Sequence, residues 1–343
     1  MQATRRVLDD KPRALILGSL AVIAIHLVNA SLFHLEDSVL ERIAWAALSV
    51  FGVAVAAAAY GSLSNAGKGL LALAFGVPAV SFGLGIHAAH VYELGVEESS
   101  YTGVPMLVAG VILLVTGMTI LVRSVHDWWR RLFFAPAAVV LLIVVFPVTL
   151  AIFATNVPVV ECCVETPADR GMAYEDVSFE TERGLTLSAW LVPSQNGATI
   201  ITVHGAGKNR ATVLDEAEML ARHGYGVLML DLEGFGDSDG RANAFGWVGA
   251  RDIHAATAYL ASRPDVDPSR IGGLGLSMGG EVLLQAAGES TALKAVVAEG
   301  ATGRTADDFG EAKAGGGQMR VFHTVVGTTM RLISGEETPP PLM

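Results

Sequence analysis

Five long apolar segments fill most of the first 158 residues and limit what this part of the chain can fold into. None of them contains a lysine, arginine, aspartate or glutamate. The segments cover residues 14–33, 43–60, 69–92, 103–122 and 132–154. A helix needs about 20 apolar residues to cross ~30 Å of hydrocarbon. The sequence therefore predicts an all-α bundle of five transmembrane helices.

The basic residues of this half predict how the bundle is oriented. The N-terminal stretch and the loops after the second and fourth segments carry eight lysines and arginines, whereas the loops after the first and third segments carry only Arg42. Loops rich in lysine and arginine stay on the cytoplasmic side of a membrane. We therefore expect a multi-pass protein of the cell membrane with a cytoplasmic N-terminus, which places everything after the fifth segment outside the cytoplasm.

Charge divides the chain into two parts. Residues 1–158 carry nine basic and nine acidic residues, whereas the rest carries 14 basic and 25 acidic residues and hence the whole net charge of −11. We expect a membrane domain over 1–158, a linker over 159–174 and a globular domain over 175–343. An acidic surface argues against a nucleic-acid partner, and the partners expected are the lipid bilayer and an acyl substrate.

The globular half alternates between strand-like and helix-like segments. Strands are expected at 176–181, 185–192, 198–203, 226–231, 271–276 and 293–299, and helices at 210–223, 247–262 and 278–288. Several of the strands are continuous apolar runs, which is typical of strands that are buried on both faces. The predicted fold class is therefore α/β, with a mostly parallel sheet and helices on both faces.

Residues 275–279 read GLSMG, which is a G-x-S-x-G pattern at the junction of a strand and a helix. In this context Ser277 is expected to lie in a sharp, strained turn that exposes its hydroxyl above the end of the strand. Glycine is needed on both sides because a side chain there would collide with the neighbouring strand or helix. Ser277 is therefore the candidate nucleophile.

A second glycine turn, HGAG at 204–207, follows the strand 198–203 directly. Such a turn can aim a backbone N–H at the carbonyl oxygen of a bound acyl group. We predict an oxyanion hole made by the N–H groups of Ala206 and Met278. His204 precedes the serine on a different strand end and is expected to be structural.

Two further features argue against a metal site. The loop DLEGFGDSDG at 231–240 is acidic, but it lacks the spacing and the terminal glutamate of an EF-hand. Cys162 and Cys163 are adjacent, and adjacent cysteines rarely pair because the geometry is strained. We therefore expect no disulfide framework, no metal and no cofactor.

The motifs HGAGKNR, DLEGFGDSDGR and GLSMGGE, in this order and spacing, resemble the α/β-hydrolase superfamily over residues 175–310. The nearest branches are the serine aminopeptidase-like (S33) and dienelactone hydrolase-like ones. The resemblance implies that Ser277 attacks an ester, amide or similar acyl bond and forms a covalent acyl-enzyme, with Ala206 and Met278 as the oxyanion hole and without a cofactor.

The acid and the histidine of a catalytic triad do not follow the superfamily pattern in this chain. The superfamily places an acid and then a histidine after the serine. Glu299 ends the strand after the nucleophile and is the candidate acid; Asp307 and Asp308 are weaker candidates. His323 follows Ser277 inside an amphipathic segment, 319–333, and is the candidate base. We expect the fold to be truncated before its last strands, in which case the chain as given lacks its base and is weakly active or inactive.

Three functions fit these observations. The leading one is a membrane-anchored serine hydrolase with a small-molecule, lipid or peptide acyl substrate. The second is a membrane interaction or transport module that keeps a hydrolase-like scaffold. The third is an envelope acyltransferase that uses the same serine and an acceptor alcohol in place of water. The sequence does not decide the substrate or the oligomeric state.

Overall fold

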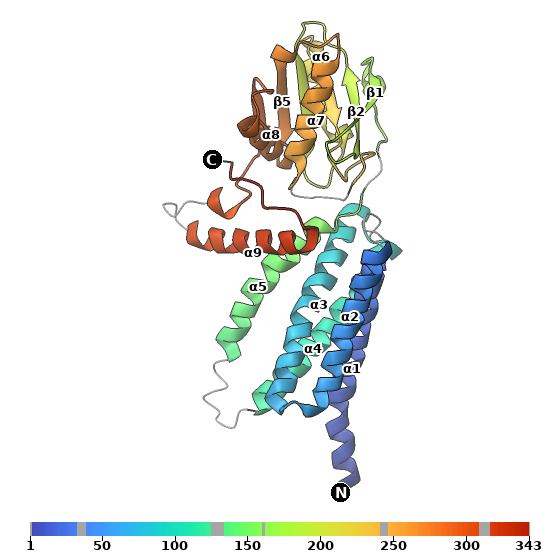
Figure 1. The fold of residues 1–343 in the computed structure, drawn as a ribbon, viewed down its shortest axis with the longest axis vertical. Helices are drawn as coiled ribbons and strands as arrows, with labels where there is room; N and C mark the ends of the chain where they lie inside the picture. The colour runs from blue at the N-terminus through green and yellow to red at the C-terminus, as the bar shows by residue number, and fades with distance from the viewer. Residues whose placement is uncertain are drawn as a thin grey trace. The chain divides into compact units, whose positions relative to one another are not determined.

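The protein is represented by a computed structural model that describes residues 2–32, 39–124, 134–159, 162–240, 246–308 and 316–342. The chain divides into two compact units, Met1–Phe153 and Ala154–Met343. Figure 1 shows a helical first unit and a second unit built around a sheet. Phe33, residues 132–133 and the loop residues Arg130 and Arg131 lie outside the described residues.

Five helices form at the five apolar segments. They are α1 (Gln2–Leu32), α2 (Val39–Ala59), α3 (Asn65–Leu94), α4 (Val104–Ser124) and α5 (Phe134–Thr155). Among the described residues, three helical stretches are long and apolar enough to cross a membrane: Pro12–Asn29, Asn65–Leu94 and Val104–Ser124. The corresponding parts of α2 and α5 are shorter, Ala46–Ser62 and Ile143–Thr155. Three spans are thus supported by length and composition, and the other two remain predictions.

Glycines spaced seven residues apart let α3 and α4 approach closely. Those on α3 are Gly69, Gly76 and Gly83; those on α4 are Gly110 and Gly117, and Gly103 precedes α4 in the same spacing. A Cβ atom added at Gly110 would lie 2.6 Å from the backbone nitrogen of Val80, and one added at Gly117 would lie 2.8 Å from the carbonyl oxygen of Gly69. Small residues at such contacts are a common way to pack helices in lipid.

The second unit contains one mixed sheet of six strands in the described residues. The strands are β1 (Glu175–Glu180), β2 (Thr186–Val192), β3 (Thr199–Val203), β4 (Gly226–Leu230), β5 (Ile271–Leu276) and β6 (Val296–Glu299). Their order is β1-β2-β4-β3-β5-β6. β2 is antiparallel to β1 and β4, whereas the β4–β3, β3–β5 and β5–β6 pairs are parallel. The carboxyl ends of β3, β4, β5 and β6 therefore meet at one edge of the sheet.

Helices cover both faces of this sheet, as alternating side chains require. One face packs Leu228 and Leu230 against α7 (Gly249–Ser262) and α8 (Met278–Glu289). The other face packs Val227 and Met229 against α6 (Leu214–Arg222). Because successive side chains of a strand point to opposite faces, β4 is apolar throughout and buried on both sides.

The segment after β6 folds mainly as a helix. The helix α9 (Gly316–Ser334) covers the amphipathic segment expected at 319–333, with Val326 and Met330 buried. The strand β6 is shorter than the expected 293–299. Residues 293–295 precede it and still run beside β5, where the backbone N–H of Lys294 donates to the carbonyl of Ile271 at 2.8 Å.

We predict that Gly110→Leu destabilises the helical unit. The larger side chain would force α3 and α4 apart, and overpacking of this kind costs about 1–3 kcal/mol. The measurement is the thermal unfolding of the detergent-solubilised chain. Gly52→Leu on α2 is the matched control, because a Cβ there meets nothing within 4 Å. Equal melting temperatures for the two variants would contradict the close packing of α3 on α4.

Candidate active site

Ser277 occupies a sharp corner between β5 and α8. The strand ends at Leu276 and the helix begins at Met278, so a single residue makes the turn. Ser277 has φ 51° and ψ −116°, and it is the one non-glycine residue with positive φ in the described part of the chain. A non-glycine residue in this region is strained and persists only where its surroundings hold it. The Ser277 side chain is exposed to solvent.

The two glycines of the pattern are required by close contacts. A Cβ at Gly275 would collide with the Gly279 carbonyl group and the Gly280 nitrogen at the start of α8. A Cβ at Gly279 would collide with the carbonyl oxygens of Val203 and His204, which end β3. The collision expected from the sequence is confirmed, since each added atom would lie closer than an ordinary contact.

Hydrogen bonds hold the backbone on both sides of the serine. The N–H of Ser277 donates to the carbonyl of Glu299, at the end of β6, with a length of 2.6 Å. The N–H of Glu281 donates to the Ser277 carbonyl at 3.2 Å and begins the helical ladder of α8. Ser277 thus stands at the amino end of a helix, where the helix dipole favours negative charge.

The HGAG turn lies beside the serine. A Cβ added at Gly205 would be 3.8 Å from the Cβ of Ser277. Met278 is the first residue of α8 and is buried, whereas Ala206 is half-buried against the sheet core. Neither the Ala206 amide nor the Met278 amide donates a hydrogen bond to another described residue. An oxyanion hole requires amides without hydrogen-bond partners near the attacking hydroxyl, so the Ala206 and Met278 amides remain candidates for it.

His204 holds the HGAG turn against the loop after β4. Its side chain is fully buried, its Nδ1–H donates to the Gly205 carbonyl at 2.8 Å, and its Nε2 accepts from the Leu232 N–H at 3.3 Å. Burial lowers the pKa of His204 to about 4, so the ring is neutral near pH 7. This position supports a structural role.

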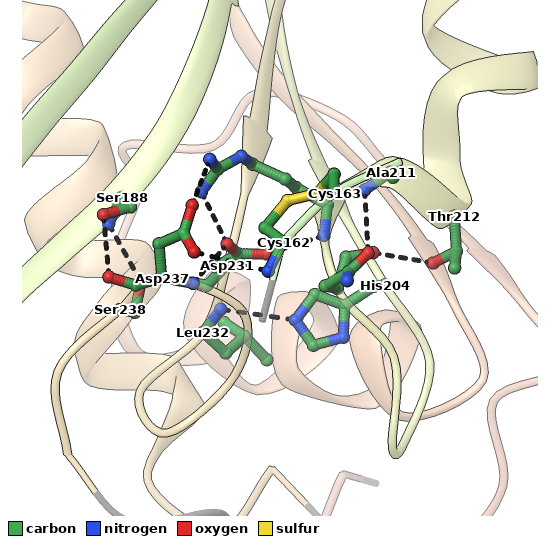
Figure 2. Close-up of polar contacts among 12 residues, drawn as sticks. Cys162, Cys163, Ser188, His204, Ala211, Thr212, Asp231, Leu232, Asp237 and Ser238 are labelled. Carbon is green, nitrogen blue, oxygen red and sulfur yellow. Dashed lines mark hydrogen bonds and ion pairs between the residues drawn. A yellow bond between two sulfur atoms is a disulfide. The ribbon is translucent and has the colours of Figure 1, made fainter. Parts of the chain in front are cut away.

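A buried ion-pair network organises the acidic loop that follows β4 (Figure 2). Asp231 is fully buried and accepts hydrogen bonds of 2.6 Å from both the backbone and the guanidinium of Arg210. The same guanidinium donates to Asp237 at 2.7 Å and lies over the ring of Trp190. Burial raises the pKa of Asp231 to about 6, and Arg210 opposes this shift.

Cys162 and Cys163 form a disulfide with one another (Figure 2), so the expectation that they stay unpaired was wrong. The surroundings account for the pairing. Both side chains pack against the apolar cluster around Trp190, and the Cys162 N–H donates to Asp237 at 3.3 Å. One ligand atom each of Cys162, Asp231 and Asp237 lies within 4.8 Å of the others. Arg210 and the disulfide already engage these atoms, which argues against a metal ion.

The candidate acid and base lie on separate elements. Glu299 is exposed at the end of β6, and its carbonyl accepts the bond from Ser277. His323 is half-buried on α9, where its Nδ1–H donates to the Arg304 carbonyl at 3.2 Å. Burial lowers the pKa of His323, while Asp308 and Glu281 act in the opposite direction. Among the described residues, no hydrogen bond joins the Ser277 hydroxyl to a histidine or a carboxylate.

Comparisons with known proteins place the second unit in a family. Residues 168–340 match the family model described as X-Pro dipeptidyl-peptidase (S15 family). The chain belongs to this family. The match supports the α/β-hydrolase superfamily and a hydrolase. The matching family model is that of the S15 family. The finer assignment of this chain to an S33-like or dienelactone hydrolase-like branch therefore stays a prediction. We call Ala154–Met343 the S15 unit.

Relatives and solved structures overlap part of the chain. It is 33% identical over 129 residues to the uncharacterized protein YfhR of Salmonella typhi, which is 36% of this chain and 42% of that protein. It is 34% identical over 121 residues to the alpha/beta hydrolase domain-containing protein WAV2 of Arabidopsis thaliana, which is 34% of this chain and 39% of that protein. The chain thus spans less than half the length of these curated relatives. The Pyrococcus furiosus esterase Pf2001 is 30% identical over 42% of this chain and 58% of its own, with a TM-score of 0.40.

Two buried carboxylates in the S15 unit escaped the sequence analysis. Glu281 lies one turn into α8 and accepts hydrogen bonds from the N–H and the hydroxyl of Thr302, at 2.9 and 2.8 Å. Asp252 lies in the first turn of α7, and its Oδ2 accepts from the Glu233 N–H at 2.9 Å. Both acids lie on helix faces that otherwise carry packed apolar residues. An acidic residue at an apolar position of the helical repeat was the sequence signal that could have identified them.

Asp252 is the more unusual of the two. It is fully buried, and its Oδ1 has no hydrogen-bond partner among the described residues. Burial raises the pKa of Asp252 from its usual 3.8 to about 8, while the hydrogen bond from the Glu233 N–H opposes this shift and the Glu233 carboxylate adds to it. Asp252 is therefore a neutral carboxylic acid near pH 7, and it ties α7 to the loop after β4.

We predict that Gly279→Ala destabilises the S15 unit, because the added Cβ collides with the end of β3. Overpacking of this kind costs about 1–3 kcal/mol. Gly288→Ala in the same helix is the matched control, since a Cβ there meets nothing within 4 Å. Alanine in a helix interior is more stable than glycine by about 0.5–1 kcal/mol, so this control should not lower the unfolding midpoint. Chemical denaturation of both variants makes the comparison, and an unchanged midpoint for Gly279→Ala would refute the contact.

We predict that Asp252→Asn reduces the dependence of stability on pH. The folded protein holds a proton on Asp252 that the unfolded chain releases, so this group stabilises the fold less as pH rises from about 4 to about 8. The variant lacks that contribution, and its stability relative to the wild type should rise over this range. Urea unfolding at several pH values measures the difference. Asp176→Asn, at an exposed position on β1, should give a constant difference.

Proposed function

We propose that the S15 unit is a serine hydrolase that cleaves an ester, amide or similar acyl bond through an acyl-enzyme on Ser277. The single observation that carries this proposal is the strained, exposed corner at Ser277. Such strain clusters at active sites, where the surrounding structure maintains it. The membership of the chain in a hydrolase family supports the same reaction class.

The reaction would use the groups around this corner in a fixed order. The Ser277 hydroxyl attacks the carbonyl carbon of the substrate, and its proton passes to a base. The carbonyl oxygen gains negative charge and accepts hydrogen bonds from the Ala206 and Met278 amides. The leaving group takes the proton as the acyl-enzyme forms, and water then releases the acid and restores the serine.

Glu299 and His323 remain the candidates for acid and base. Glu299 lies beside the nucleophile, because its backbone carbonyl accepts a hydrogen bond from the Ser277 N–H. The His323 ring is hydrogen-bonded to the Arg304 carbonyl, and it would have to break this hydrogen bond to accept the proton of the Ser277 hydroxyl. Serine without a base is a weak nucleophile, so the rate of reaction with an electrophile reports whether His323 takes part.

The helical unit would hold the S15 unit at a membrane. Three helices of sufficient length and apolar character support this anchor. The distribution of basic residues supports a cytoplasmic N-terminus and an S15 unit outside the cytoplasm. The substrate would then be a peptide, lipid or small-molecule acyl compound of that compartment, and the family description favours a peptide.

Labelling with a fluorophosphonate tests the nucleophile, because this probe reacts with activated serines. The wild-type chain should be labelled, slowly if its base is incomplete, and Ser277→Ala should not be labelled at all. Ser262→Ala, at an exposed serine of α7, is the control and should label normally. Folded wild-type protein that resists the probe would count against catalysis. His323→Gln tests the base separately, and labelling at the wild-type rate would remove His323 from the mechanism.

A further inference from the structure

A cavity of about 480 Å³ lies within the helical unit, at the end where α3 begins and α4 finishes. We call it the basic pocket, and it is lined by Pro12, Tyr60, Asn65, Lys68, Ile120, Arg123 and Ser124. These residues come from α1, from the short helix η1 (Tyr60–Ser62), and from α3 and α4. All of them belong to Met1–Phe153, so the pocket is separate from the candidate active site of the S15 unit.

The lining is positively charged. Its described residues include the cations Lys68 and Arg123 and no carboxylate. Neither cation forms an ion pair with a described residue. The Lys68 ammonium lies 5.3 Å from the centre of the Tyr60 ring, which is buried and forms part of the wall. Two cations that line one cavity and have no described carboxylate partner favour an anionic ligand.

Neutral groups add donors to the same pocket. Asn65 contributes a side-chain amide that can donate hydrogen bonds to phosphate oxygens, whereas the Ser124 hydroxyl already donates to the Leu121 carbonyl at 2.7 Å. Asn65 is also the first residue of α3, whose amino end is capped by the Ser64 hydroxyl. The positive end of a helix dipole favours a nearby anion. The polar rim therefore has the donors that a phosphate group needs, while Pro12 and Ile120 offer apolar contact.

The position along the helices favours a lipid as the source of the phosphate. The pocket lies at an end of two helices that are long enough to cross a membrane, where headgroups would be found. It is also the end that carries the excess of lysine and arginine and is expected to face the cytoplasm. Anionic lipids give that leaflet its negative surface potential.

We propose that the basic pocket binds the phosphate group of an anionic phospholipid. Lys68 and Arg123 neutralise its charge, Asn65 donates hydrogen bonds to it, and Tyr60 forms the wall beneath Lys68. The inference rests on the proposed insertion of the helical unit into a membrane and is independent of hydrolysis at Ser277. A bound lipid would fix the ends of α1, α3 and α4 relative to one another.

Native mass spectrometry of the full chain in detergent, titrated with phosphatidylglycerol or phosphatidylcholine, tests the proposal. Phosphatidylglycerol should remain bound at lower concentrations than phosphatidylcholine. A basic residue near an anionic surface contributes about 1 kcal/mol, which corresponds to roughly fivefold in affinity. Lys68→Gln and Arg123→Gln should each weaken the phosphatidylglycerol complex by about that factor. Lys68→Arg and Arg123→Lys keep the charge and should retain binding.

Arg13→Gln is the comparison variant, because Arg13 is an exposed cation of α1 that acts electrostatically on Tyr60 but does not line the pocket. If Arg13→Gln weakens the complex as much as Lys68→Gln, the attraction is general and the pocket assignment is wrong. Equal binding of the two lipids would also overturn it. Retained helical circular dichroism in each variant shows that loss of binding is not loss of folding.

Two further experiments distinguish a lipid from free phosphate as the ligand, and failure of the pocket assignment from failure of the membrane anchor. If inorganic phosphate alone displaces the lipid and binds the detergent-solubilised chain equally tightly, the site is a phosphate site and the lipid assignment fails. Carbonate extraction of membranes that contain the full chain tests insertion itself. A chain that resists extraction but does not prefer phosphatidylglycerol contradicts only the pocket, whereas an extracted chain contradicts the membrane anchor as well.

Discussion

The left-handed backbone at Ser277 is the constraint on which the S15 unit depends. A non-glycine residue reaches this conformation only where neighbouring atoms leave no alternative. Here β6 supplies a carbonyl to the Ser277 N–H, and the helix α8 begins immediately afterwards. Gly275 and Gly279 allow the helix to approach two strands at distances that no side chain would permit. The corner is thus maintained by the packing of the sheet and not by the serine side chain, which remains exposed.

Buried polar groups fix the loops at the same edge of the sheet. His204 joins the turn after β3 to the loop after β4, Asp231 joins that loop to Arg210 in the segment before α6, and Asp252 connects the loop to α7. A buried polar group that loses its partner is strongly destabilising, so each loop has few alternative positions. The HGAG turn therefore keeps a defined place beside Ser277 even though it is a loop.

The sequence predicted the features that follow from local pattern. Strand-like runs, most of them continuously apolar, located the six strands of the described residues, and the G-x-S-x-G spacing located the corner at Ser277. It missed features that depend on contacts between distant residues. The Cys162–Cys163 disulfide forms where Trp190 and Asp237 hold the chain, and the altered pKa of Asp252 arises from complete burial under a loop. Likewise, the seven-residue spacing of glycines in α3 and α4 indicates close packing only once the structure shows that these two helices contact each other.

The loop after β6 connects the nucleophile helix to the end of the described chain. Glu281 donates its N–H to the Ser277 carbonyl and accepts both donors of Thr302 through its carboxylate. Further along, Asp308 accepts the N–H groups of Arg304 and Leu342. His323 is bonded to the Arg304 carbonyl on the same loop. One short stretch of chain, from Thr302 to Asp308, thus contacts the nucleophile helix through Glu281 and contacts α9 through Arg304.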